Sequence, residues 1–185
     1  MNVLIDANIL YSTVQRMLIF EIARGGGFAP FFSERILSEW VHAAGRAGPE
    51  ARAIALGDAA LLRASWPGAL VTPPSALDAE LWLPDPADVH VFAAAIHGGC
   101  DLVLTQNLRD FPREVLAERG IAPSHPDAFL LGLLKGTPGD VSRAALSVLG
   151  EVRRQSGQDW SAAALFKKAR LPRFAKALGD GPAVQ

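Results

Sequence analysis

Short apolar runs alternate with helix-like stretches along most of the chain. Runs at 2–5, 28–32, 70–72 and 102–104 are typical of strands that are buried on both faces. Between and around them, apolar residues at helical spacing predict helices over 14–23, 33–44, 49–64 and 85–97. Since strands alternate with helices, the pattern predicts βαβ units. We expect an α/β fold with three layers, α/β/α, around a mostly parallel central sheet.

The last part of the chain is predicted to be helical. Further helical segments are expected at 113–119, 126–134, 141–152 and 161–168. Pro138 and Gly139 separate the body from this tail. We therefore expect a main α/β domain over 1–137 and a C-terminal helical extension over 138–185.

Composition favours one buried core and excludes several classes of protein. Half of the 185 residues are hydrophobic, yet no apolar run is long enough to span a bilayer. The apolar stretch before Asp6 is too short for a signal peptide, so we expect a cytoplasmic protein with no membrane segment. A single cysteine, Cys100, excludes a disulfide or a cysteine-based zinc site within one chain.

The net charge of −1 gives no general attraction to nucleic acid. The body is acidic and the segment after residue 139 is basic. A nucleic-acid substrate would therefore have to be drawn by local basic patches or bridged by a metal ion.

Polar residues follow the two clearest buried strands. Asp6 comes directly after the first strand, and Thr105 and Asn107 follow the strand at 102–104. In open parallel sheets, ligands bind beyond the carboxyl ends of strands, where the strand order reverses. If these two strands are neighbours, their polar ends lie in one crevice. A metal ion or hydrogen bonds would then offset the burial of Asp6. Asp6 and Asn8 are equally explained as residues that shape a strand-to-helix turn.

Three more acids are candidates, each with an ordinary structural explanation. Asp85 and Asp88 fit the N-cap and third position of a helix, so capping alone explains their spacing, although the same turn could direct Asp88 into the crevice. Glu39 lies on the flank of its helix, where a solvated glutamate is usual. Asp110 is either a loop acid or a metal ligand. Together with Asp6, the side chains of Asp88, Glu39 and Asp110 offer the oxygen ligands that Mg²⁺ or Mn²⁺ prefers.

The sequence does not support a zinc site, a common nucleotide-binding motif, a serine nucleophile or a phosphatase. His42, His90, His97 and His125 lack a zinc-like spacing and are interpreted as structural or surface residues. There is no phosphate-binding loop, dinucleotide fingerprint or serine nucleophile motif. A phosphatase with Asp6 as nucleophile is disfavoured because Asn8 stands where the second acid would be.

Four segments together resemble the PIN domain family of metal-dependent ribonucleases, particularly its branch of VapC-type toxins. The segments are Val3–Tyr11, Ser33–Trp40, Leu83–Val91 and Leu104–Pro112, in the order of the family. The resemblance implies a PIN-like fold. It also implies a site of the following residues: Asp6, Glu39 and Asp88 as acidic metal ligands, with Thr105, Asn107 and Asp110 completing the pocket.

The resemblance implies hydrolysis of RNA phosphodiester bonds with Mg²⁺ or Mn²⁺. It also implies a cognate antitoxin protein and a possible homodimer. Asn107 departs from the family, because many members place an acid there, and Asp110 could substitute for it. The alternative is a catalytically weak PIN-like module that binds RNA or a protein. Cationic residues that could contact RNA phosphates are Arg35, Arg109, Arg113, Lys167, Lys168 and Arg170, although solvated surface positions explain each of them as well.

Overall fold

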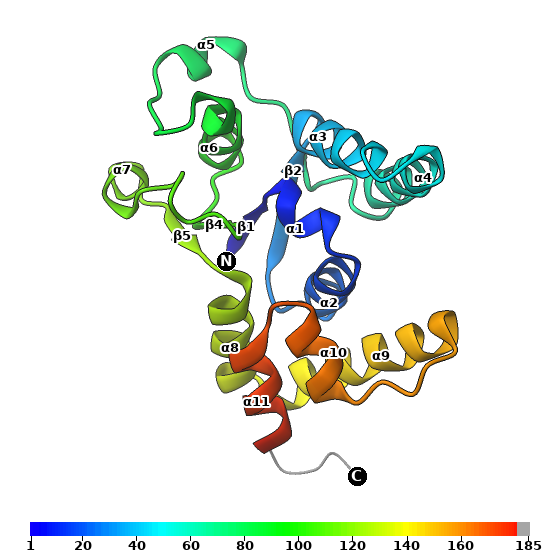
Figure 1. Cartoon of the computed structure of the whole chain (residues 1–185). Coiled ribbons are helices and arrows are strands. Elements are labelled where there is room, and N and C mark those ends of the chain that lie inside the picture. Colours follow the sequence, from blue (N-terminus) through cyan, green and yellow to red (C-terminus); the bar gives the residue numbers. More distant parts are fainter. Residues whose placement is uncertain (181–185) are drawn as a thin grey trace. The chain divides into compact units, whose positions relative to one another are not determined.

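The computed structural model describes residues 1–180 and contains a five-stranded sheet whose strands are all parallel (Figure 1). The strands are β1 (Asn2–Ile5), β2 (Ala29–Ser33), β3 (Leu70–Val71), β4 (Leu102–Leu104) and β5 (Ala122–Ser124), in the order β3-β2-β1-β4-β5. Helices flank the sheet. The prediction of an α/β fold of the PIN-like α/β/α class is confirmed, and β5 is an addition to the predicted strands.

The helices begin and end close to the predicted positions. They are α1 (Ala7–Tyr11), α2 (Thr13–Arg24), α3 (Glu34–Gly45), α4 (Pro49–Ser65), α5 (Ser75–Ala79), α6 (Val89–His97), α7 (Arg113–Ala117), α8 (Pro126–Gly136), α9 (Pro138–Ser156), α10 (Ala162–Lys168) and α11 (Pro172–Asp180), with a 3₁₀ turn η1 (Pro86–Asp88) before α6. The Ser33 hydroxyl accepts a hydrogen bond from the Ile36 amide at 3.2 Å and caps α3. Pro138 is the first residue of α9, a position that proline tolerates, so Pro138 and Gly139 are helical.

The strand order reverses between β1 and β4. From β1 the chain adds β2 and then β3 on one side, whereas β4 and β5 extend the sheet on the other side of β1. Ile5 pairs with Leu104, and both side chains are fully buried, as the apolar runs predicted. The Asp6 amide donates to the Leu104 carbonyl at 3.1 Å. This register places Asp6 and Thr105 next to each other at the carboxyl ends of neighbouring strands.

The chain forms two compact units. The first consists of Met1–Tyr11 and Phe28–Ser124 and holds the sheet, α1 and α3 to α7. The second combines Ser12–Gly27 with the chain from His125 onwards, so it groups α2 and α8 with α9, α10 and α11. The predicted helical C-terminal segment is present. The predicted domain boundary between residues 137 and 138 stays a prediction.

Buried polar contacts hold the second unit together. The Gln15 side chain, which is fully buried in α2, donates to the Ala169 carbonyl at 2.7 Å. Asp127, at the start of α8, accepts the backbone amides of Arg173 at 3.1 Å and Phe174 at 2.9 Å, and so caps the first turn of α11. Across residues 1–180, no helix has both the length and the apolar composition needed to cross a membrane.

Replacing Asp127 with alanine should destabilise the protein, because it leaves amides in the first turn of α11 without an acceptor. The expected loss is about 1–3 kcal/mol in the free energy of unfolding, measured by urea denaturation. Asp159→Ala is the control, since the Asp159 side chain is 94% exposed and its loss should cost less than about 0.5 kcal/mol. Equal stability of the two variants would contradict the capping role of Asp127.

Candidate metal centre

Asp6 is a buried carboxylate at the end of β1. It is 5% exposed, and its Oδ2 accepts hydrogen bonds from the Thr105 hydroxyl at 2.7 Å and the Asn8 amide at 2.5 Å. Burial raises the pKa of Asp6 above its ordinary value, the Thr105 hydrogen bond opposes the rise, and the Glu39 charge adds to it. A negative charge at this position therefore has a free-energy cost that a bound cation would offset.

Thr105 and Asn8 form a network that joins the ends of β1 and β4. The Asn8 amide donates to the Thr105 hydroxyl at 3.0 Å, and the backbone amides of Gln106 and Asn107 donate at 3.0 Å to Asn8 Oδ1 and Thr105 Oγ1. Thr105 is fully buried and its hydroxyl is used inside this network. Through these hydrogen bonds it positions Asp6 and the following loop. Asn8 therefore links the ends of two strands, in addition to its place in the turn after β1.

Three further carboxylates lie together beside these strand ends. Asp88 is the last residue of η1, Asp85 directly precedes η1, and Asp110 lies in the loop after β4. One oxygen from each side chain can be chosen so that all three lie within 4.8 Å of one another. Asp88 is half-buried. Burial, followed by the charges of Asp6, Asp85, Asp110 and Glu39, raises the pKa of Asp88 to about 6. The four acids predicted from the sequence thus act on one another electrostatically, and Asp85 joins them.

Capping explains Asp85 but not Asp88. The Asp85 carboxylate accepts the Ala87 amide at 2.9 Å, which is the predicted N-cap contact. The Asp88 side chain makes no capping hydrogen bond at the start of α6. The sequence left two explanations open for Asp88. Its position supports the second, in which the side chain points into the acidic cluster.

Glu39 reaches the acidic cluster from α3 and is held by two basic side chains. Its Oε1 lies 2.8 Å from His90 Nε2 and 3.4 Å from Arg35 Nε, and the Glu39 side chain is 40% exposed. His90 is buried in α6, and within residues 1–180 neither Nδ1 nor Nε2 makes a hydrogen bond, so its contact with Glu39 is a close approach of the two groups. Glu39 is thus a paired carboxylate, not the solvated residue that its flank position indicated.

His90 is a site residue that the sequence interpretation assigned only to structure or surface. It lies two residues after Asp88, but that spacing carries no signal by itself. Its contact with Glu39 joins α6 to α3, which only the tertiary structure brings together.

Asn107, the residue that departs from the family pattern, contacts Asp110, which was expected to supply the missing carboxylate. Its side-chain amide donates a short hydrogen bond to Asp110 Oδ2, and the Asp110 backbone amide donates to the Asn107 carbonyl at 3.3 Å. Asn107 therefore holds Asp110 in place and adds no negative charge to the cluster.

The donor set fits a hard divalent cation. Asp85, Asp88 and Asp110 offer carboxylate oxygens within 4.8 Å of one another, and these are the ligands that such cations prefer. Burial, followed by repulsion from neighbouring acids that include Asp6 and Glu39, raises the pKa of Asp88, and a cation would relieve that repulsion. The fold and these residues together define an α/β protein with a candidate metal centre at the switch point of its sheet.

Comparison with known families identifies the family of the chain. The family model described as PIN domain matches residues 2–109, more than half of the chain, so the chain belongs to the PIN domain family. Proteins of this family are typically metal-dependent nucleases. Asp110 lies just beyond the matched segment. No curated protein and no solved structure matches the chain.

Replacing Asp88 with asparagine should stabilise the metal-free protein at about pH 7.5. Because folding raises the pKa of this carboxyl to about 6, its neutral form supports folding at low pH. That contribution is lost as the pH rises through about 6. Allowing for its partial exposure, the gain should be about 1 kcal/mol, or roughly 2–4 °C in Tm.

Thermal unfolding in EDTA at about pH 7.5 and about pH 4 measures this effect, with Glu118→Gln as the control at an exposed carboxylate of the same unit. The gain should disappear near pH 4, where Asp88 is largely neutral. Adding Mg²⁺ should then stabilise the wild type more than the variant. A gain of the same size at both pH values would contradict the charge explanation.

Proposed function

We propose that this chain is a metal-dependent endoribonuclease that hydrolyses RNA phosphodiester bonds in the cytoplasm with Mg²⁺ or Mn²⁺. The observation that carries the proposal is the cluster of acids from β1, α3, η1 and the loop after β4, in a chain that belongs to the PIN domain family. A few isolated carboxylates on the surface would not support a nuclease site, because exposed carboxylates are common on proteins. Here their charges act on one half-buried carboxylate at the switch point of the sheet.

In this proposal Asp6, Asp88, Glu39 and Asp110 hold the cation, and Asp85 adds negative charge beside them. A bound divalent cation would neutralise charge on the phosphate and lower the pKa of the attacking water. Thr105 and Asn8 fix the carboxylate of Asp6 through hydrogen bonds, and His90 Nε2 lies 2.8 Å from the carboxylate of Glu39. Exposed Asn107 orients water or substrate at the mouth of the site. Without a cation the acids would repel RNA.

Cleavage of an RNA substrate by the purified chain tests the proposal. We expect activity with Mg²⁺ or Mn²⁺, none in EDTA, and a loss of about a hundredfold or more in Asp6→Asn and Asp88→Asn. Glu118→Gln, which removes an exposed carboxylate outside the cluster, should retain the wild-type rate. Equal cleavage by wild type and Asp6→Asn would refute the nuclease assignment.

We also propose that the chain is the toxin of a type II toxin–antitoxin pair, of the VapC-like branch, with a small antitoxin as partner and a homodimer as its assembly. Expression in a bacterial host should arrest growth, whereas Asp6→Asn should not, and co-expression of an adjacent small gene should restore growth. Light scattering of the purified chain measures the dimer. Growth arrest of the same extent by both proteins would count against the toxin assignment.

A second candidate function rests on Asn107. Since an amide replaces an acid that many family members carry, and ties Asp110 by a hydrogen bond, the site has one carboxylate fewer for metal. The chain would then be a catalytically weak module that binds RNA or a protein. Retained RNA binding without divalent-dependent cleavage would favour this module over the nuclease.

A further inference from the structure

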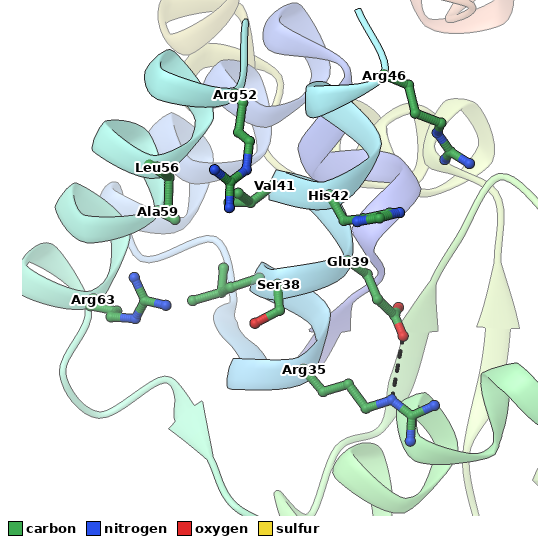
Figure 2. A pocket seen from close by; sticks show the side chains of 11 residues that line it. Arg35, Ser38, Glu39, Val41, His42, Arg46, Arg52, Leu56, Ala59 and Arg63 are labelled. Carbon is green, nitrogen blue, oxygen red and sulfur yellow. Dashed lines mark hydrogen bonds and ion pairs between the residues drawn. The ribbon is translucent and has the colours of Figure 1, made fainter. Parts of the chain in front are cut away.

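A pocket of about 640 Å³ lies between α3 and α4 in the first unit (Figure 2). Its floor is apolar, with buried Leu37, Val41 and Ala59 and the half-exposed Leu56. Its rim is basic. Among the described residues, the lining includes one carboxylate, Glu39, together with the following arginines: Arg35, Arg46, Arg52 and Arg63. Figure 2 shows Arg52 and Arg63 extending from α4 toward α3.

Two of these arginines are paired with acids. Arg63 makes a bidentate contact with Glu34, at 2.8 and 2.6 Å, and this contact lowers the pKa of Glu34. Arg35 lies 3.4 Å from Glu39 and 3.9 Å from Asp78. These partners neutralise part of the positive charge at the rim. Arg63 and Arg35 therefore have less capacity to attract a further anion.

Arg46 and Arg52 make no ion pair within residues 1–180, and both are exposed. The Arg52 stem packs against the end of α3, where a Cβ added at Gly45 would lie 3.2 Å from Arg52 Cδ. This contact directs the guanidinium of Arg52 into the space beside Val41 (Figure 2). In a chain of net charge −1, the two groups are a local concentration of available positive charge.

Glu39 joins this pocket to the acidic cluster. It lines the pocket, and its Oε1 lies 2.8 Å from Nε2 of His90, two residues after Asp88. Arg35, which also lines the pocket, donates to the Ala87 carbonyl of η1 at 3.5 Å. A polyanion that reached the acidic cluster would therefore pass beside the arginines. The cluster needs a cation to accept a phosphate, whereas the arginines accept one directly.

We propose that the α3–α4 pocket binds the RNA strand beside the cleaved bond, with Arg46 and Arg52 contacting its phosphates. This inference rests on the proposed function, because it takes RNA as the substrate. The apolar floor faces a sugar or base of the bound nucleotide, since a nucleotide combines an apolar face with an anionic phosphate. Guanidinium groups suit phosphate oxygens through paired N–H donors. An acidic protein segment is the competing occupant, and the test separates the two.

The test measures binding of a fluorescent single-stranded oligouridylate at several salt concentrations. All proteins carry Asp88→Asn and are kept in Mg²⁺, so that cleavage does not disturb the measurement. Arg46→Gln and Arg52→Gln remove the charge but keep the aliphatic stem. Each should weaken binding about threefold to tenfold and lower the slope of log K against log salt by about 0.7. Arg119→Gln, an exposed arginine of the same unit outside the pocket, should change neither value.

Gly45→Ala provides a second variant that displaces Arg52 without removing any charge. Alanine suits this helical position, and its Cβ would approach Arg52 Cδ closely. We expect weaker RNA binding with an unchanged Tm. If both arginine variants and Gly45→Ala bind RNA as tightly as the parent, the pocket does not bind RNA and the inference is wrong. If the wild type cleaves RNA but the arginine variants bind RNA as tightly as the parent, only this inference is wrong. If the arginine variants bind RNA more weakly but the wild type does not cleave RNA, only the nuclease proposal is wrong.

Discussion

Repulsion between carboxylates that folding brings together is the constraint on which the site depends. Asp6 is buried at the end of β1, and the half-buried Asp88 is surrounded by the charges of Asp6, Asp85, Asp110 and Glu39. Folding such a cluster opposes stability unless protons or a cation neutralise it. The rest of the structure supplies what holds the acids in place: paired parallel strands, the Thr105–Asn8 network and the contact between His90 and Glu39. The chemistry of these carboxylates suits a divalent cation.

Helix α3 connects the acidic cluster to a basic surface. It carries Glu39, whose charge acts on Asp6, and Arg46, which directly follows the helix, lines the pocket shared with α4. Acids and arginines thus lie next to each other in a chain whose net charge is close to zero. A nuclease needs both kinds of group. In the proposed nuclease, the acids would hold a cation at the cleaved phosphate, and the arginines would bind neighbouring phosphates without a cation.

The local pattern of apolar and polar residues was sufficient to predict most helices and strands and some of the site residues. The apolar runs correctly predicted β1 and β4, and Asp85 is the N-cap that its position indicated. The pattern missed β5, because its Ala122–Ser124 segment contains proline and has no apolar run. It also missed α1, α5 and α11, which are short or lie beyond the clearest periodic segments. The two units divide the chain at places that no local signal marks, since α2 packs with helices far along the sequence.

The sequence by itself determined which residues have oxygen atoms for a metal and which strands are buried, because composition and periodicity are local properties. Resemblance to a family added Glu39 to those candidates. Only the tertiary structure decided that Asp85 joins the cluster, that His90 contacts Glu39 and that Thr105 is enclosed. It also decided that Arg46 and Arg52 face one pocket. The reason is that pKa shifts and ion pairs depend on distances between segments that lie far apart along the chain, and those distances are set by strand order and helix packing.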